Sequence, residues 1–360
     1  MPDRTIILGI ESSCDETACA LVAGGRAVLS SVVASQIDLH ARFGGVVPEI
    51  ASRAHIEAIN TVIEQAIAAA GVSPGHIAAV AVTHEPGLIG SLLVGLMAAK
   101  TLAWAWDKPL VGVNHVYAHA YAAALEAPAI DYPAAALICS GGHTALYRCD
   151  SPTRLELLGT TIDDAAGEAF DKVAAILNLG YPGGPAIDRI ARTGNAKAVD
   201  FPRTLLRGQS LDFSFSGIKT AVLYHVNGVP GAVRRRATGK GRTPSSGGAG
   251  KGAGGLSPQE VADIAASFQA AVVDVLRIKL RRAARLIGAK TLILGGGVAA
   301  NSALRAALTD LAARLRIPLR MPELRFCLDN AAMTAGLAFH YLREGKVDTL
   351  DLEANATVRR

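Results

Sequence analysis

The most restrictive feature of the sequence is a unit that occurs twice: an apolar strand, a short polar turn and a second apolar strand. The first copy reads TIILGI at residues 5–10, then ESSCDETA and CALVAGGRAVL, and the second reads AAALI at 134–138, then CSGGHT and ALYRC. One such hairpin is ordinary. Two matched hairpins about one domain apart predict an internal duplication, and the N–H groups and hydroxyls of each turn suit a phosphate.

Helical patterns separate and follow the two hairpins. Residues 49–70 predict an amphipathic helix that ends at Gly71, and HEPGLIG at 84–90 opens a second, apolar helix. Further helices are expected over 162–179 and 256–288, within 181–192 and 298–315, and after residue 327. Strands that alternate with helices predict an α/β fold with a largely parallel or mixed sheet.

The composition limits the class of protein. The chain has 360 residues, 50% of them apolar, but we find no run of about 18 apolar residues that would cross a bilayer. We therefore expect no membrane partner, and no signal peptide at the N-terminus. The five cysteines are scattered without a CxxC pair, which favours a reducing, cytoplasmic location. A net charge of +5 permits a nucleic-acid partner without requiring one.

One segment differs in character from the rest of the chain. Residues 228–257 are basic, rich in glycine and without apolar periodicity, which predicts a flexible loop. Such a loop either stays solvated or touches a phosphate backbone, and the residues leave both readings open.

A third glycine turn lies late in the chain, in LILGGGVAANSAL. Gly295, Gly296 and Gly297 follow a strand and precede a helix, but they lack the GxGxxG spacing of a dinucleotide fingerprint. The turn either lets a ligand approach the backbone or simply joins strand to helix. Together with the paired hairpins it resembles the plan of the actin, sugar-kinase and heat-shock ATPase superfamily, in which two similar subdomains enclose a nucleotide cleft.

This plan predicts how the chain is divided. Residues 1–133 form the first subdomain, with a helical insertion around 36–70. The second subdomain is expected over 134–345, with a helical insertion around 163–225 and the basic loop, followed by a tail over 346–360.

Two histidines stand four residues apart in NHVYAHAYA at 114–122. On a helix His115 and His119 would share one face, one turn apart. The spacing suits half of a metal site, but from the residues alone two unrelated helix histidines are the favoured interpretation.

Motifs along the whole chain carry a more specific resemblance. HARFGGVVPEIASRAH at 40–55 closely resembles the signature of the tRNA threonylcarbamoyl-adenosine transferases, once catalogued as O-sialoglycoprotein endopeptidases. The supporting stretches are GIESSCDETA at 9–18, PGLIGSLLVG at 86–95, NHVYAH at 114–119, CSGGHT at 139–144, DDAAGEAFDK at 163–172, YPGGP at 181–185, FSFSGIKT at 213–220, GGGVAAN at 295–301 and CLDNAAM at 327–333. The resemblance leaves out only the basic loop and the last few residues.

The resemblance implies an acyl-type transferase. Its members move the threonylcarbamoyl group from threonylcarbamoyl-AMP to N6 of the adenosine beside the anticodon, in tRNAs that read codons beginning with A, and AMP leaves. The bacterial partners it implies are a shorter paralogue with the same fold and a small P-loop ATPase.

The resemblance also implies site residues. The metal ligands would be His115, His119 and Asp329, holding one divalent ion, Fe²⁺ or alternatively Zn²⁺. Substrate would be bound by Ile138, Cys139, Ser140, Gly141, Gly142, Asp171, Gly184, Asp188 and Asn301. Asp15 and Glu16, in the first hairpin, are the candidates for the general base that removes the N6 proton.

Three other functions fit this sequence less well. A zinc protease of the HExxH type needs Glu after its first histidine, where this chain has Val116. The histidine pair and the signature stretch argue against a small-molecule kinase of the same fold. The histidine pair and the complete nucleotide loop argue against a non-catalytic scaffold. Two departures from the family pattern are Val116–Tyr117, where an acid is common, and His84–Glu85, where small residues are usual.

Overall fold

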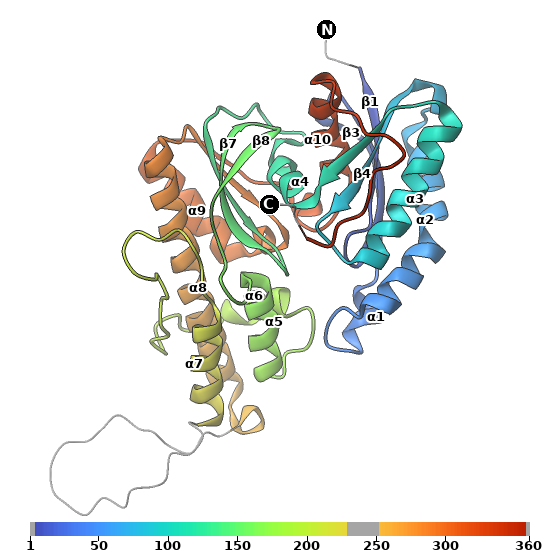
Figure 1. Cartoon of the computed structure of the whole chain (residues 1–360). Coiled ribbons are helices and arrows are strands. Elements are labelled where there is room, and N and C mark those ends of the chain that lie inside the picture. Colours follow the sequence, from blue (N-terminus) through green and yellow to red (C-terminus); the bar gives the residue numbers. More distant parts are fainter. Residues whose placement is uncertain (1–3, 229–251, 358–360) are drawn as a thin grey trace, which may run out of the picture.

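The computed structural model describes residues 4–228 and 252–357 and contains two five-stranded sheets (Figure 1). The first has the order β3-β2-β1-β4-β5 and the second β10-β9-β6-β7-β8. The strands are β1 Ile6–Glu11, β2 Glu16–Ala23, β3 Ala27–Ser35, β4 Ile77–Glu85, β5 Leu110–Asn114, β6 Ala134–Cys139, β7 Thr144–Ser151, β8 Arg154–Thr160, β9 Thr291–Gly295 and β10 Leu319–Arg320. Residues 229–251 of the predicted basic loop lie outside the described residues.

The two sheets have the same topology, which confirms the predicted duplication. β1 pairs antiparallel with β2 and parallel with β4. β6 likewise pairs antiparallel with β7 and parallel with β9. Each predicted hairpin therefore forms the centre of its own sheet, and each polar turn lies at the carboxyl end of a central strand. Ligands of open α/β sheets bind at such ends.

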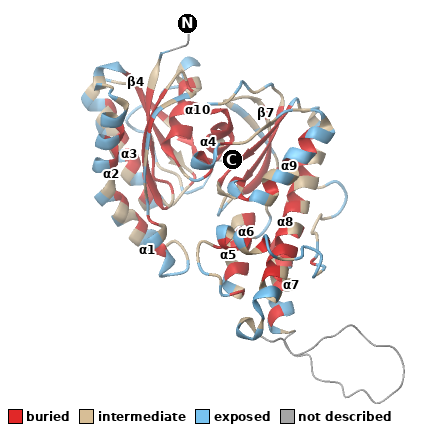
Figure 2. Cartoon of the chain, turned by 180° about the vertical axis from the view of Figure 1, so that it is seen from behind, coloured by how far each residue is buried: buried red, intermediate tan, exposed pale blue. Residues whose placement is uncertain are grey.

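Helices cover both sheets, and their buried faces are shown in red in Figure 2. They are α1 Ile37–Ala41, α2 Pro48–Ala70, α3 Ile89–Trp106, α4 His115–Tyr121, α5 Ala166–Ile176, α6 Gly183–Ala191, α7 Ser216–Asn227, α8 Pro258–Ile287, α9 Ser302–Leu315 and α10 Ala331–Arg343. The predicted stop at Gly71 is confirmed, because this residue caps α2 with a left-handed backbone, φ 63°. α2 and α3 pack on one face of the first sheet through Ile59, Val62 and Leu96.

The last helix belongs with the first sheet in space, although it follows the second in sequence. α10 packs on β1, β2 and β4 and shares a buried core with Ile7, Ala18 and Val22. Gly9 permits this approach, since a Cβ there would lie 2.5 Å from the carbonyl oxygen of Ala331. The boundaries at residues 133 and 345 stay a prediction. α10 lies within the range predicted for the second subdomain, but it packs on the sheet of the first subdomain.

Two sequence expectations differ from the structure. The helix expected over 162–179 begins only at Ala166, because Asp163 is turned aside to accept hydrogen bonds from Ser214 and from the start of α7. The expected absence of a long apolar run was wrong, because α3 has the length and composition of a membrane-spanning helix. Only 33% of its residues are buried, those on one face, and this face packs on β4 and α2. Length and composition alone do not distinguish a core helix from a span.

Candidate metal and nucleotide site

The two histidines are placed by the way α4 begins. Asn114 ends β5 and caps the helix, since its Oδ1 accepts hydrogen bonds from the backbone N–H of Val116 at 3.0 Å and of Tyr117 at 3.2 Å. Its Nδ2 donates to Glu85, which fixes the orientation of the amide. His115 is therefore the first residue of the helix. His119 lies one turn later on the same face, with the ring centroids 4.5 Å apart.

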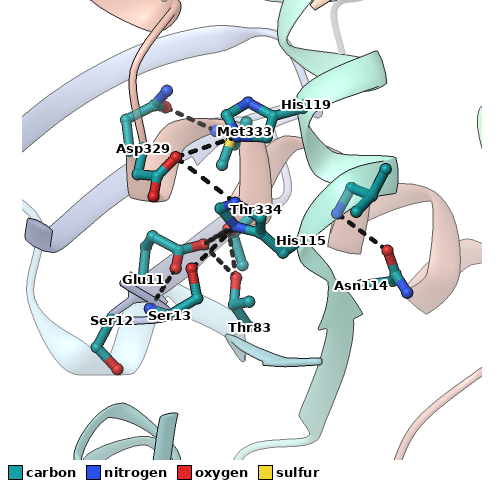
Figure 3. A network of polar contacts seen from close by, with 12 residues as sticks. Glu11, Ser12, Ser13, Thr83, Asn114, His115, His119, Asp329, Met333 and Thr334 are labelled. Atoms are coloured by element: carbon teal, nitrogen blue, oxygen red, sulfur yellow. Dashed lines mark hydrogen bonds and ion pairs between the residues drawn. The ribbon is translucent and has the colours of Figure 1, made fainter. Parts of the chain in front are cut away.

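Asp329 completes a cluster of three potential ligands. It lies in the turn before α10, and its Oδ1 is 3.1 Å from Nε2 of His119 and 3.5 Å from Nε2 of His115 (Figure 3). One ligand atom from each residue lies within 4.8 Å of the other two. Two imidazoles and one carboxylate suit Fe²⁺ or Zn²⁺ and leave coordination positions open. The donor set therefore fits the metal that the family resemblance implies.

A buried carboxylate supports His115 from behind. Glu11, the last residue of β1, has its Oε2 3.2 Å from Nδ1 of His115, and Oγ of Ser13 lies 3.1 Å from the same nitrogen. Burial lowers the pKa of His115, but Asp329 and Glu11 outweigh burial and raise the pKa to about 9. Burial would raise the pKa of Asp329, but the adjacent histidines hold it below its ordinary value. The cluster therefore brings charged groups of opposite sign together inside the protein.

The first hairpin turn packs beside this cluster and contains both candidate bases. Asp15 and Glu16 are buried. Burial, followed by the charges of Asp329 and Asp15, raises the pKa of Glu16 to about 10, so that its carboxyl is protonated at neutral pH. The turn is anchored by His55 of the signature stretch, whose ring bonds to Thr17 at 2.7 Å and to the carbonyl of Cys14 at 3.0 Å.

The second hairpin turn approaches the same cluster from the other sheet. The side chains of Ile138 and Cys139 are fully buried in β6, so these residues offer only backbone atoms to a ligand. The turn is closed by bonds between Ser140 and His143, and a Cβ on Gly141 or Gly142 would meet nothing within 4 Å. Burial, followed by His115 and His119, lowers the pKa of His143 to about 4. These electrostatic effects place the turn beside the histidine pair.

The remaining predicted substrate residues fall into two groups. Asp171 of α5 accepts a hydrogen bond from the N–H of Gly183 at 2.7 Å, next to Gly184, where a Cβ would meet nothing within 4 Å. Burial raises the pKa of Asp171, and Asp15 contributes to the rise, which places the first hairpin within electrostatic reach. Asp188 of α6 accepts a hydrogen bond from Ser302, the neighbour of Asn301.

Asn301 and the glycine run have structural partners. Asn301 caps α9 by accepting a hydrogen bond from the N–H of Leu304, and its amide donates to Gln269 at 2.7 Å. A Cβ on Gly295 would lie 2.3 Å from the carbonyl oxygen of His119, and one on Gly296 would lie 2.2 Å from that of Cys139. These two glycines therefore let three backbone segments pack closely, and only Gly297 faces more open space.

Sequence reasoning missed several residues that organise the site. The hydroxyls of Thr83 and Thr334 surround Glu11, and Asn114 determines where the histidine helix starts. The only signal for Asn114 was its place between a strand and the histidine pair, where an N-cap residue is common. No pattern indicated the two threonines, because they come from β4 and α10.

Comparison with known proteins gives a consistent result. The family model of tRNA N6-adenosine threonylcarbamoyltransferase matches residues 27–336. Proteins of that name from Trichlorobacter lovleyi and Symbiobacterium thermophilum are each 51% identical, over 352 residues (98% of this chain and 96% of the relative) and 349 residues (97% and 95%).

Solved structures share the fold at low sequence identity. HypF from T. kodakarensis has a TM-score of 0.60 at 14% identity, over 96% of this chain and 48% of HypF. ROK hexokinase from Thermus thermophilus has a TM-score of 0.50 at 15% identity, over 95% of this chain and 99% of the hexokinase. The predicted sugar-kinase-like α/β fold with two similar subdomains is confirmed. By sequence along nearly its whole length, the chain is a member of the tRNA N6-adenosine threonylcarbamoyltransferase family.

Proposed function

We propose that this chain transfers the threonylcarbamoyl group from threonylcarbamoyl-AMP to N6 of the adenosine beside the anticodon, in tRNAs that read codons beginning with A, forming N6-threonylcarbamoyladenosine and releasing AMP. Membership of the family supports the activity. The observation that carries the assignment to this site is the meeting of His115, His119 and Asp329 beside both hairpin turns.

The three clustered residues would hold one divalent metal ion, Fe²⁺ or Zn²⁺. Such an ion, with open coordination positions, supplies Lewis-acid polarisation of a phosphate or carbonyl oxygen. The ligand atoms come from α4 and from the turn that precedes α10, and these two helices pack against each other, so the chain itself determines where the ion would lie.

The adenylate would lie between the two turns. The unobstructed backbone of Gly141 and Gly142 suits a phosphate, and the carboxylates of Asp171 and Asp188 suit ribose hydroxyls. Ile138, Cys139 and Ser140 lead into the second turn, and Gly184 and Asn301 would contact the adenylate from the starts of α6 and α9. Since the adenylate is already activated, holding it in line with N6 supplies much of the rate.

The proton of N6 needs an acceptor as the new carbon–nitrogen bond forms and the bond to AMP breaks. Glu16 is protonated at neutral pH and suits a hydrogen-bond donor better than a base. We assign the general base to Asp15, which lies in the same turn.

The partners we propose are tRNA, a shorter paralogous subunit and a small P-loop ATPase, in the cytoplasm. α3 supports a protein partner, because its outward face exposes Ile89 (49%), Leu93 (46%), Met97 (56%) and Trp104 (75%) in one stripe. A stripe of this kind on a half-buried helix suits a partner helix better than a membrane, whose lipids would require an apolar surface all round. We expect that the purified chain does not sediment with lipid vesicles. We also expect that the Trp104→Glu variant no longer forms the complex with the paralogue.

The deciding experiment supplies the purified chain with threonylcarbamoyl-AMP, unmodified tRNA and the proposed partners. Nucleoside mass spectrometry then scores the modified adenosine, for the wild type and for the His115→Ala, His119→Ala double variant. Product from the wild type alone, with the variant folded, supports both the transferase and the ligand pair. Equal product from both removes the metal proposal and keeps the transferase.

Absence of product from the wild type, beside a known transferase that is active with the same partners, contradicts the proposal. The kinase and scaffold alternatives would then be tested by incubating the chain with ATP and candidate small-molecule acceptors and by measuring its affinity for the partners.

A further inference from the structure

Glu11 is a fully buried carboxylate without a lysine or arginine among the partners seen in the described residues. Its Oε1 accepts a hydrogen bond from the backbone N–H of Ser13 at 2.7 Å. Its Oε2 accepts one from the hydroxyl of Thr83 at 2.5 Å and lies 3.2 Å from Nδ1 of His115, with the hydroxyl of Thr334 at 3.5 Å. Burying a carboxylate is costly unless its lone pairs are satisfied, and here four groups surround it.

The contact with His115 selects one form of the imidazole. In the neutral imidazole that a metal requires, Nδ1 carries the proton and donates a hydrogen bond to Glu11, and Nε2 has a free lone pair directed at the Asp329 side of the ring. A ligand histidine depends on this arrangement, because the partner of one ring nitrogen decides which nitrogen is left for the metal.

His119 has no comparable support. Its Nδ1 is buried and without a hydrogen-bond partner in the described part of the chain. The orientation of His119 therefore depends on helix packing and on Asp329, whereas His115 is fixed by a bonded network. Thr83 and Thr334 also contact each other at 3.1 Å, so this network ties together β1, β4, α4 and α10.

We propose that Glu11 is a positioning residue that fixes the tautomer and ring orientation of His115, and that it thereby couples the first hairpin turn to the metal ligands. This inference rests on the proposed metal site. The same carboxylate that orients His115 also holds the N–H of Ser13, two residues before Asp15. A displacement of the hairpin turn would therefore move His115, and a displacement of His115 would move the hairpin turn.

Glutamine cannot replace Glu11 in this network. Both carboxylate oxygens accept from donors, the N–H of Ser13 on one side and His115 with Thr83 on the other. An amide has only one oxygen, so its NH₂ group must face either Ser13 or His115. Facing His115, it donates to Nδ1 and moves the ring proton to Nε2, which then cannot bind the metal.

The test compares Glu11→Gln with the wild type and with Ser12→Ala. Ser12 is the neighbouring buried residue, but its hydroxyl bonds to Ser91 and Gly95 rather than to the histidine. Zn²⁺ affinity is measured by competition with a chelator, and ¹⁵N NMR of the Zn²⁺-loaded protein reports the protonated nitrogen of His115. We expect Glu11→Gln to lower the affinity by about 10–100-fold and to change the His115 Nδ1–H signal. We expect Ser12→Ala to leave both unchanged.

Unchanged affinity and an unchanged signal in folded Glu11→Gln would overturn the inference. Should Glu11→Gln fail to fold, Thr83→Val removes one donor to Glu11 at nearly constant volume. A drop in Zn²⁺ affinity of several-fold then supports the inference, and wild-type affinity overturns it. Failure of the wild type to bind Zn²⁺ or Fe²⁺ would instead contradict the metal proposal itself. Neither the Zn²⁺ affinity nor the NMR signal depends on transferase activity.

Discussion

Asp329 lies 3.1 Å from Nε2 of His119, although 210 residues separate them in the sequence. The contact exists because α10 returns to the first sheet and packs against α4. The proposed metal site therefore depends on the packing of these two helices, and its ligands respond to changes in either.

The carboxylate of Asp329 is expected to be essential for metal binding. Asp329→Asn keeps the size of the side chain but removes the charge, so the Zn²⁺ or Fe²⁺ affinity should fall by at least about tenfold. Metal content after dialysis measures this. Asp310→Asn is the matched control, since Asp310 lies exposed on α9 and forms a surface ion pair with Arg314. Equal metal content in Asp329→Asn and the wild type would contradict its role as a ligand.

Variants of the glycine run can distinguish glycines needed for close backbone packing from glycines that leave space for a ligand. Gly295→Ala places a Cβ against the backbone of His119 and should lower the free energy of unfolding by about 2 kcal/mol or more. Gly297→Ala meets only the end of Leu328, at 3.4 Å, and should cost less than about 1 kcal/mol. Urea unfolding measures the free energy of unfolding of both variants. A similar cost at the two positions would show that close packing at His119 is not the reason for Gly295.

The cap of the histidine helix should contribute to stability. Asn114→Ala removes the acceptor for two N–H groups and should lower the free energy of unfolding by about 1–2 kcal/mol. Asn114→Ser keeps a capping oxygen and should recover most of the loss. Thermal unfolding of chelator-treated protein measures both, and a Ser variant as unstable as the Ala variant would contradict the capping role.

The two acidic residues of the first turn should differ in their importance for turnover. Glu16 is already neutral at pH 7, because its pKa is raised to about 10, so Glu16→Gln should lower the rate of adenosine modification less than tenfold. Asp15→Asn removes the proposed base and should lower the rate by about 100-fold or more. Single-turnover rates with saturating tRNA make the comparison. The opposite order would reassign the base to Glu16.

Because of Lys279, the free energy of unfolding should change with pH in the alkaline range. Its ammonium group is buried in α8 and donates to the carbonyls of Leu205 and Ser210. Burial, followed by Arg282, lowers its pKa to about 8 from the ordinary 10.5. Between these values the unfolded chain binds more protons than the folded one, so this group makes the protein more stable as the pH rises from 8 to 10.5, by up to about 3 kcal/mol.

The measurement subtracts Lys279→Met from the wild type. Other groups titrate in the same pH range, but they are common to both proteins, so the difference in unfolding free energy isolates Lys279. The wild type should gain relative to the variant between pH 8 and 10.5. A difference that does not vary with pH would contradict the lowered pKa.

Much of the fold could be predicted because it follows from local pattern. Alternating apolar strands, the stop at Gly71 and two equivalent polar turns were enough to indicate a duplicated α/β architecture. The strands β3 and β8 were harder to recognise, because these outer strands are partly exposed and lack a continuous apolar run.

The sequence by itself determined the family, the duplicated hairpins and the identity of the three clustered residues. Only the tertiary structure decided which groups surround them: Glu11 behind His115, the buried Glu16 with its raised pKa, and glycines that serve backbone packing. The physical reason is that spacing along the chain records which residues share a strand or a helix. Burial, hydrogen-bond partners and protonation depend on neighbours that other elements bring in from distant parts of the chain.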